Sequence, residues 1–151
     1  MSLKGILKKT KAYEIGLAQV LVTKAANNQR SHLLAQYDLS SIEWFILGTV
    51  YDETPAGGIR VTDLATLFDV KTTYITSILR LLKDKGYATT QNNPQDARVR
   101  LVVATKKAND VINAIEESIQ EETEQRLSDK VTDEQFRSYI YVLQESARTQ
   151  S

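Results

Sequence analysis

The sequence predicts a mainly α-helical fold with one small β-hairpin, and three observations support this prediction. Apolar residues recur at three- and four-residue steps over most of the 151-residue chain, which is the period of amphipathic helices. Two short runs, 87–91 and 98–103, are rich in β-branched and aromatic residues, as strands are. A polar segment, residues 92–97, joins these runs and contains a proline, which is typical of a hairpin loop.

An N-terminal helix is expected over residues 3–26. One face of it comprises side chains three or four residues apart: Leu3, Ile6, Leu7, Thr10, Tyr13, Glu14, Leu17, Val20 and Leu21. The polar run 27–29, two asparagines and a glutamine, predicts that this helix stops or kinks there. A second, short helical turn is then expected over residues 31–37.

The next helix is expected to begin at Ser40 and to continue through Val50. Ser40 and Glu43 have the spacing of a capping box, in which each side chain satisfies a free backbone donor of the first turn. The helix is apolar around most of its circumference, so we expect it to be the most buried helix. Residues 54–58 include a proline and two glycines and predict a loop, and residues 59–61 can add a third short strand.

A pair of helices follows, over residues 62–68 and 71–85, with a tight turn at Asp69 between them. Thr62 is expected to cap the first helix. The inward side chains of the first helix are Leu64, Ala65, Leu67 and Phe68, and those of the second are Ile75, Ile78, Leu79 and Leu82. Gly86 can take the left-handed conformation that ends a helix, and lysines precede it.

Two more helices are expected after the hairpin. The first begins at Thr105, and its stripe comprises Ala108, Val111, Ile112, Ile115 and Ile119. Thr132 and Gln135 have the spacing of a second capping box, which begins the last helix. The stripe of the last helix comprises Phe136, Tyr139, Ile140, Leu143 and Ala147.

The first and last helices present more apolar surface than a small hairpin domain can cover, which favours a two-fold homodimer. The expected dimer interface residues are Ile6, Leu7, Tyr13, Leu17, Phe136, Tyr139, Ile140 and Leu143. The alternative is that these helices fold back on their own domain. The sequence thus divides into N-terminal dimerisation helices (1–37), a central domain (38–107) and C-terminal dimerisation helices (108–151).

Charge is distributed unevenly along a chain whose formal net charge is zero. Residues 1–37 and 69–107 each carry a net charge of +5, whereas residues 38–68 carry −4 and residues 108–135 carry −7. The neutral total argues against a strongly DNA-attracting surface, but the positive charge lies on the helix pair and hairpin and on the N-terminal segment.

A helix pair followed by a two-stranded hairpin is the outline of a winged helix-turn-helix, which places one helix in the major groove of DNA. Reading base edges requires short hydrogen-bonding side chains near the start of that helix. The candidates in this recognition helix are Lys71, Thr72, Thr73, Tyr74, Thr76, Ser77 and Arg80. The alternative is an ordinary polar face directed to solvent.

The hairpin supplies a second set of DNA-binding candidates, in the wing: Asn93, Gln95, Asp96, Arg98 and Arg100. An arginine at a hairpin tip can enter the minor groove, and Asp96 is positioned to orient the Arg98 guanidinium through a planar pair. The alternative is a surface ion pair that holds the hairpin. Lys83 and Lys85, with Lys71 and Arg80, are candidate phosphate contacts.

The stretch from Leu39 to Ala108 resembles the MarR family, the multiple antibiotic resistance regulators. The matching segments are the buried helix 39–47, the first motif helix 61–70, the recognition helix and its exit 75–87, the wing-tip Asp96-Ala97-Arg98, and 104–108. The resemblance implies a cytoplasmic, homodimeric transcriptional regulator that binds a pseudo-palindromic operator, with repression as the expected mode. Regulators of the staphylococcal accessory type share this fold and are a neighbouring interpretation.

Four features differ from the family pattern. Lys71 replaces the usual capping serine, Ser77 and Thr89-Thr90 stand where arginines are common, and Ala104 and Ala108 replace leucine and glycine. Two of these differences remove positive charge from the DNA face. They motivate an alternative function, a winged-helix module for dimerisation or partner binding with weak or no DNA binding.

The resemblance also implies a small aromatic or anionic effector, for which the candidate pocket residues are Tyr13, His32, Tyr37 and Trp44. The alternative is that the aromatic residues are core and the histidine is structural. An enzyme is not expected, because the chain has one histidine, no cysteine and no glycine-rich phosphate loop. No cofactor, metal site or membrane span is expected from the sequence.

Overall fold

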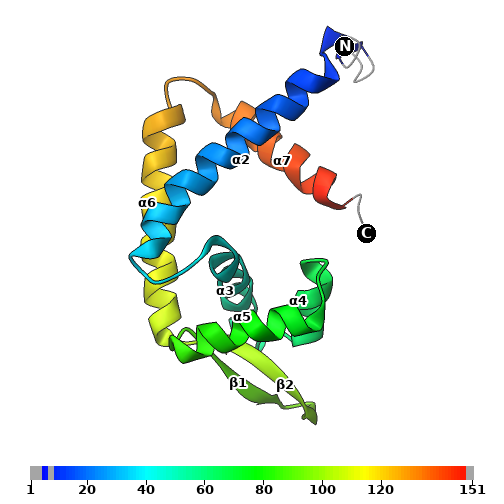
Figure 1. The fold of residues 1–151 in the computed structure, drawn as a ribbon, viewed down its shortest axis with the longest axis vertical. Helices are drawn as coiled ribbons and strands as arrows, with labels where there is room; N and C mark the ends of the chain where they lie inside the picture. The colour runs from blue at the N-terminus through cyan, green and yellow to red at the C-terminus, as the bar shows by residue number, and fades with distance from the viewer. Residues whose placement is uncertain (1–4, 7–8, 149–151) are drawn as a thin grey trace. The chain divides into compact units, whose positions relative to one another are not determined.

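The computed structural model describes residues 5–6 and 9–148 (Figure 1). The chain divides into two compact units, Met1–Asn113 and Ala114–Ser151. The elements are α2 (Ala12–Ala35), α3 (Ser41–Glu53), the short 3-10 helix η1 (Thr54–Ala56), α4 (Val61–Leu67), α5 (Thr72–Asp84), β1 (Ala88–Asn93), β2 (Asp96–Ala104), α6 (Lys106–Leu127) and α7 (Asp133–Arg148). A mainly helical fold with a small β-wing is therefore confirmed.

Helix α2 is one uninterrupted helix, so it does not stop at residues 27–29. Asparagine costs only a few tenths of a kcal/mol in a helix interior, roughly 0.6, which the surrounding turns can offset. The Asn27 side chain is also used, because Arg30 Nη2 donates to Asn27 Oδ1 at 2.9 Å. The predicted stripe residues Leu3 and Leu7 lie outside the described residues.

Helix α3 begins with the predicted capping box. The Ser40 N–H donates to Glu43 Oε2 at 2.8 Å, and the Glu43 N–H donates to Ser40 Oγ at 3.4 Å. One face of α3 is buried, since Ile46, Leu47 and Val50 have no exposed surface. Most of the remaining α3 residues are half-buried, as predicted for the most buried helix, although Phe45 is 39% exposed.

The helix pair is present, but α4 differs from its prediction in two respects. The residue that caps α4 is Arg60, in extended conformation, and Thr62 lies inside the first turn. Leu67 is 65% exposed, because the buried stripe of this short helix is centred on Leu64 and Ala65. The predicted inward set of α5 is confirmed: Ile75, Ile78, Leu79 and Leu82 are all buried.

The wing is an antiparallel hairpin of β1 and β2, with a bulge between Asn92 and Asn93. Its tip is shorter than the predicted loop 92–97, because Asn93 and Asp96 both belong to strands. The Asn93 Oδ1 atom accepts from the Gln95 N–H at 2.9 Å, which closes the turn early. The predicted third strand is reduced to a single bridge between Ile59 and Val102.

Gly58 allows this bridge to form. It has φ +97°, and a Cβ built on it would collide with the Val102 carbonyl and the Val103 side chain. Gly58 therefore brings the backbone before α4 against β2, and the Ile59 N–H donates to the Val102 carbonyl at 3.0 Å.

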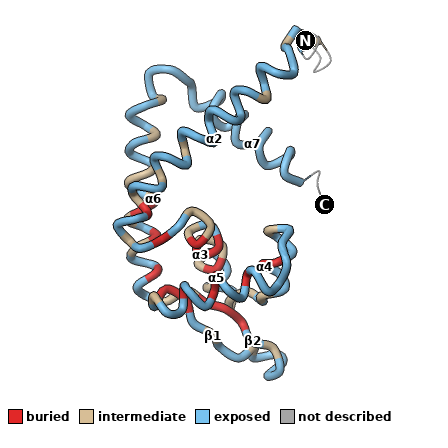
Figure 2. The backbone as a smooth tube through the Cα atoms, in the orientation of Figure 1, coloured by how far each residue is buried: buried red, intermediate tan, exposed pale blue. Residues whose placement is uncertain are grey.

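Buried residues of the first unit concentrate on α3, α5, β2 and the start of α6 (Figure 2). Thr105 begins α6 as predicted, since the Ala108 N–H donates to its Oγ1 at 3.2 Å. In the second unit, the capping box of Thr132 and Gln135 is also confirmed. Helix α7 nevertheless buries none of its residues. Within residues 5–6 and 9–148, no helix is long and apolar enough to cross a membrane.

Candidate nucleic-acid interface

The turn between α4 and α5 fixes where α5 begins. The Val70 N–H donates to the Ala65 carbonyl at 3.0 Å, and the Asp69 N–H donates to the Thr66 carbonyl at 3.2 Å. This pair of bonds closes the end of α4 around Asp69, which has φ 50°. Aspartate tolerates the left-handed conformation better than most residues, so the chain can turn here without glycine.

The N-terminus of α5 is open toward solvent. Lys71 precedes the helix in extended conformation, and its side chain forms no capping hydrogen bond. The first backbone N–H groups of a helix lack intrahelical partners and favour anions. Beside them lies an open hollow of about 930 Å³, lined by Thr62, Ala65, Thr66, Asp69, Val70, Lys71, Thr72 and Thr73. This surface can accept phosphate groups.

The seven predicted recognition-helix side chains are all exposed. Thr73, Thr76, Ser77 and Arg80 follow the i, i+3, i+4, i+7 spacing of one helix face. The Thr76 hydroxyl donates to the Thr72 carbonyl at 2.9 Å, and the Ser77 hydroxyl donates to the Tyr74 carbonyl at 2.7 Å. Both hydroxyl oxygens can still accept hydrogen bonds from base edges or water.

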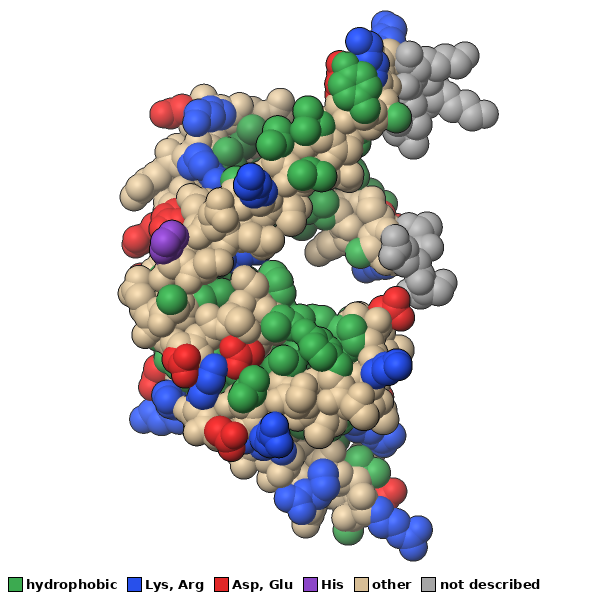
Figure 3. All heavy atoms as spheres, viewed as in Figure 1, with side chains coloured by type: hydrophobic (Ala, Val, Ile, Leu, Met, Phe, Trp, Pro, Cys, Tyr) green, Lys and Arg blue, Asp and Glu red, His purple; other side chains and the backbone are tan. Residues whose placement is uncertain are grey.

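In the wing, the predicted Asp96–Arg98 guanidinium pair is wrong. Asp96 Oδ1 instead accepts from the Arg98 backbone N–H at 3.0 Å, as aspartate commonly does beside a turn. Among the residues that the structure describes, the Arg98 guanidinium forms no ion pair. Arg100 is also exposed, and its Nη2 donates to Thr90 Oγ1 at 3.2 Å. Lysine and arginine side chains are visible around the hairpin in Figure 3 (blue, lower end).

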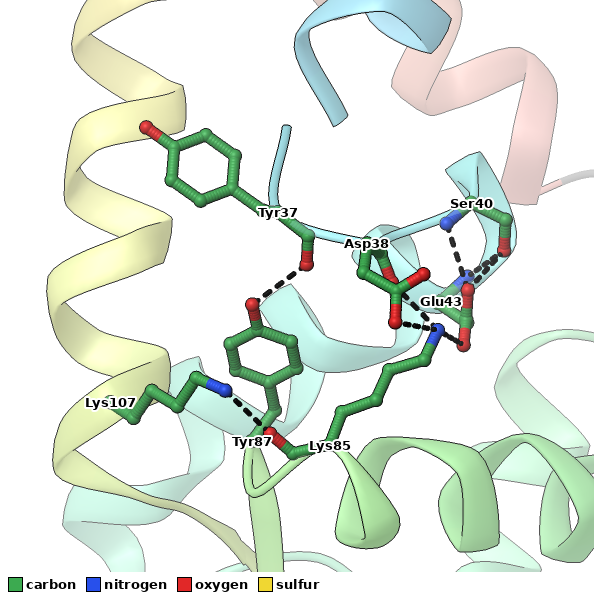
Figure 4. Close-up of polar contacts among 7 residues, drawn as sticks. All are labelled: Tyr37, Asp38, Ser40, Glu43, Lys85, Tyr87 and Lys107. Atoms are coloured by element: carbon green, nitrogen blue, oxygen red, sulfur yellow. Dashed lines mark hydrogen bonds and ion pairs between the residues drawn. The ribbon is translucent and has the colours of Figure 1, made fainter. Parts of the chain in front are cut away.

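Lys85 is not available as the predicted phosphate contact. Its Nζ atom donates to the Asp38 carbonyl at 2.6 Å and to Glu43 Oε1 at 2.7 Å, and Asp38 Oδ2 lies 3.7 Å away (Figure 4). The side chains of Lys85 and Glu43 are 22% and 6% exposed. The ammonium group therefore neutralises an acid within the protein.

The pKa values of this ion pair are shifted in opposite directions. Burial acts to raise the Glu43 pKa, but hydrogen bonds from Lys85 and Ser40 outweigh burial and leave it lowered. Burial acts to lower the Lys85 pKa, but the hydrogen bond and charge of Glu43, with the charge of Asp38, leave it raised. Both groups are therefore held in their charged forms.

The exit of α5 is held by further contacts. Gly86 has φ 77°, and the Tyr87 N–H donates to the Leu82 carbonyl at 2.8 Å, which ends the helix as predicted. The Tyr87 hydroxyl donates to the Tyr37 carbonyl at 2.7 Å, and Lys107 Nζ donates to the Lys85 carbonyl at 2.6 Å (Figure 4). Burial, with the charge of Asp38, raises the pKa of Tyr87. Sequence reasoning missed this cluster, because no sequence signal places residues 37–43 beside residues 85–87.

The MarR family model matches residues 37–99, from the turn after α2 into β2 of the wing. The resemblance to this family that the sequence shows is therefore confirmed over these residues. No curated protein matches the sequence.

Solved structures extend the likeness of this chain beyond the winged helix. The apo form of wild-type MarR from E. coli is 20% identical, covers 87% of this chain and 95% of its own, and has a TM-score of 0.66. The MepR–DNA complex from S. aureus is 21% identical, with coverages of 93% and 98% and a TM-score of 0.65. CouR from Rhodococcus jostii RHA1 bound to p-coumaroyl-CoA is 18% identical, with coverages of 88% and 91% and a TM-score of 0.75. At these identities the likeness shows the fold.

The candidate effector residues are not all brought together within the single chain. Tyr13 and His32 are both exposed on α2, where a separation of 19 residues corresponds to about 28 Å. Tyr37 and Trp44 are half-buried. Sequence reasoning missed Arg30, whose guanidinium carbon lies 5.9 Å from the Trp44 ring centroid and 5.2 Å from that of Phe45.

Every predicted dimer residue that the structure describes is exposed in the single chain. The exposed fractions are Ile6 49%, Tyr13 65%, Leu17 54%, Phe136 39%, Tyr139 46%, Ile140 38% and Leu143 44%. Leu7 lies outside the described residues. Figure 3 shows hydrophobic side chains along α2. In the described part of the chain, no group of three or more His, Asp or Glu side chains is arranged to hold a metal ion.

Proposed function

We propose that this protein is a DNA-binding transcriptional regulator that acts as a homodimer. Helix α5 enters the major groove, and the wing contacts the flanking minor groove. The observation that carries the proposal is the exposed face of α5, with its hydroxyls and Arg80, followed by a wing whose Arg98 guanidinium forms no ion pair within the described residues. Such a face can read base edges, and such a wing can reach the minor groove.

The roles of individual residues follow from what their side chains can offer. Thr73, Thr76 and Ser77 have short hydroxyl side chains that can contact bases, and Tyr74 can contact a thymine methyl group. Lys71 and the open N-terminus of α5 suit phosphate. In the wing, Arg98 and Arg100 suit the negative potential of the minor groove, while Asn93, Gln95 and Asp96 hold or flank the tip.

The homodimer is proposed because large apolar side chains are left uncovered in both units. Helix α2 exposes Tyr13, Leu17 and Val20. In the second unit, a groove of about 540 Å³ between α6 and α7 is lined by Ile119, Leu127, Val131 and Phe136, among other residues. Exposed apolar surface of this kind is typical of a subunit interface. A two-fold dimer would recognise a pseudo-palindrome with half-sites about 10 bp apart, and we propose repression as its mode.

A small planar anion is the effector class that the structure favours. Arg30 lies against the Trp44–Phe45 ring pair, whose centroids are 5.1 Å apart, and its Nε is buried without a hydrogen-bond partner in the described residues. Such a group can bind a carboxylate while the rings cover an aromatic plane. CouR, which shares the fold, has been solved with p-coumaroyl-CoA bound.

The proposal is tested by selecting bound sequences from a random DNA library and then measuring affinity for them over a salt series. A regulator should enrich a pseudo-palindrome, and its log affinity should fall steeply with log salt. Arg98→Ala should weaken binding about tenfold and reduce the salt slope by about one. Lys130→Ala removes one exposed cation outside the winged helix and serves as the matched control.

A flat or absent response at low salt would contradict DNA binding. That result would favour the second candidate, a winged-helix module for dimerisation or partner binding. The observation that supports this candidate is the formal net charge of zero, together with the use of Lys85 inside the protein.

A further inference from the structure

The buried ion pair of Lys85 and Glu43 has no part in the DNA contacts described above. We propose that Lys85 and Glu43 are positioning residues for DNA binding, which hold the C-terminal end of α5 against the corner between α2 and α3. The inference rests on the proposed function. All the residues involved lie within the first compact unit, Met1–Asn113.

The ammonium group of Lys85 is bound by oxygens from one corner of the fold. It contacts the Asp38 carbonyl at 2.6 Å, Glu43 Oε1 at 2.7 Å and Asp38 Oδ2 at 3.7 Å. Asp38 follows α2 and has φ 54°, and Glu43 lies in the first turn of α3. One side chain at the end of α5 therefore joins the segments on both sides of the corner.

The acceptor is fixed independently of Lys85. Glu43 Oε2 accepts from the Ser40 N–H at 2.8 Å and from the Ser40 hydroxyl at 2.7 Å. The capping box thus holds one carboxylate oxygen and directs the other toward Lys85 (Figure 4). A preorganised acceptor of this kind gives the ion pair a defined geometry, because few rotamers of either side chain satisfy all its bonds.

The same corner has a second attachment to the exit of α5. The Tyr87 hydroxyl donates to the Tyr37 carbonyl at 2.7 Å, one residue before Asp38. Lys107 Nζ donates to the Lys85 carbonyl at 2.6 Å and lies 4.4 Å from the Tyr87 ring centroid. Contacts on both sides of Gly86 restrict rotation of α5 about its end.

A small rotation at this end matters at the DNA-reading end. Thr72 and Lys85 are 13 residues apart, which is about 20 Å along a helix. A tilt of about 10° at Lys85 would therefore move Thr72 by about 3 Å, which exceeds the tolerance of a hydrogen bond. The corner also fixes the direction in which α2 leaves the winged helix, so Lys85 and Glu43 relate the reading helix to α2.

The direction in which Glu43→Gln changes DNA affinity distinguishes a positioning role from an effect of net charge. Glu43→Gln keeps an oxygen that can accept from the Ser40 N–H, so the capping box is retained. Removing an acid should strengthen DNA binding if only net charge matters. Positioning predicts the opposite, a loss of about fivefold or more, which is the lower end of typical coupling between sites.

Substitutions of the lysines give matched comparisons on one helix. Lys85→Met should weaken DNA binding without reducing the salt slope, because its ammonium contacts protein and not phosphate. Lys85→Arg should restore most of the affinity. Lys83→Met removes an exposed cation two residues away, and it should reduce the salt slope by about one if Lys83 contacts phosphate. The double variant Glu43→Gln/Lys85→Met should bind DNA no more weakly than Lys85→Met alone.

A distance measurement tests the inference without DNA. The chain has no cysteine, so spin labels can be placed at Asn28→Cys on α2 and Ser77→Cys on α5, both exposed positions. Labelled chains are diluted with unlabelled protein so that each assembly carries one labelled chain. The distance distribution should be narrow in the otherwise unsubstituted chain and with Lys83→Met, and broader or shifted with Lys85→Met and Glu43→Gln.

The outcomes distinguish this inference from the proposed function. If the unsubstituted protein does not bind DNA at low salt, the proposed function fails. An altered distance distribution would then show that the Lys85–Glu43 ion pair positions α5 but has no role in DNA binding. If DNA is bound, unchanged or stronger binding by Glu43→Gln overturns the inference. An unchanged distance distribution overturns it too. If Lys85→Met does not fold, as judged by circular dichroism, Glu43→Gln decides alone.

Discussion

Helices α5 and α7 have the same apolar spacing and opposite burial. The stripe of α5 is Ile75, Ile78, Leu79 and Leu82, and that of α7 is Phe136, Tyr139, Ile140 and Leu143. Both follow i, i+3, i+4, i+7. The α5 side chains are at most 8% exposed, whereas those of α7 are 38–46% exposed. An apolar period therefore specifies which face of a helix will be buried, but not which molecule buries it.

The physical reason is that the two stripes have different partners within the chain. The α5 stripe belongs to a core shared with α3, α4 and β1, and its burial stabilises the single chain. The α7 stripe remains in contact with water until something covers it, and burying apolar area contributes about 25 cal/mol per Å². In the proposed homodimer, the second copy supplies that cover.

The largest effect is expected from truncating the buried stripe. Leu82→Ala should lower the free energy of unfolding by about 2–5 kcal/mol, because Leu82 has no exposed surface and the cavity cannot fill with water. Leu143→Ala, the matched change at the same stripe position of α7, should cost less at low protein concentration. Urea denaturation at several protein concentrations measures both. Equal losses for the two variants at every concentration would remove the distinction between the helices.

A charged residue on the α7 stripe should weaken the proposed homodimer. Ile140→Asp is expected to weaken dimerisation by about 2 kcal/mol or more, roughly 30-fold, since it buries an unpaired carboxylate in the interface. Gel filtration with light scattering measures the molecular mass as a function of concentration. Tyr141→Asp is the control, because Tyr141 is 63% exposed and lies off the stripe. A mass that Ile140→Asp leaves unaltered would count against α7 as the interface.

The two capping boxes offer a smaller comparison of the same regions. Ser40→Ala should destabilise the first unit by about 1 kcal/mol, because its hydroxyl serves both the Glu43 N–H and the Glu43 carboxylate. Thr132→Ala removes a cap whose hydroxyl accepts from the Gln135 N–H at an exposed site, so it should cost less, about 0.5 kcal/mol. Thermal unfolding followed by circular dichroism measures both losses. A larger loss for Thr132→Ala would reverse the ranking.

The smallest effect is expected in the acid limb of stability. The Glu43 pKa is lowered from its ordinary value of 4.5, so its contribution is present above that value and is lost as pH falls through the folded pKa. Glu43→Gln should therefore show a shallower loss of stability below about pH 4.5 than the unsubstituted chain. Glu145→Gln, which disrupts an exposed ion pair of α7, should change little. An identical acid limb for Glu43→Gln would contradict this prediction.

Much of the fold could be predicted because local chemistry determines it. The capping boxes at Ser40 and Thr132, the glycine exit at Gly86 and the α5 stripe each depend on residues within one or two turns. Helix α2 continues through residues 27–29, against the prediction, because asparagine is only a weak helix breaker and the turns on either side favour the helix. The wing tip is shorter than predicted because Asn93 accepts a hydrogen bond from the turn, which composition alone does not reveal.

The sequence predicts the side chains of the candidate site that are exposed because of helix geometry. It does not predict those whose roles depend on contacts with residues far away in the sequence. The recognition face follows from helix geometry and polar side chains, and its DNA contacts remain a prediction. Lys85 has the same charge and helix as Lys83, yet it is bound by Asp38 and Glu43, more than 40 residues earlier. Arg30 likewise meets Trp44 and Phe45 only after the chain folds. Pairings of this kind depend on tertiary structure.

Gly58 has a consequence for how this chain can vary. Any side chain at this position would meet the Val102 carbonyl and would also need an unfavourable backbone conformation at φ +97°. A saturation library selected for a folded wing should therefore return glycine alone at position 58, whereas Gly48, with nothing within 4 Å of its Cβ position, should accept alanine. The lack of a side chain at position 58 thus permits the backbone contact between this segment and β2, and no other amino acid can replace glycine there.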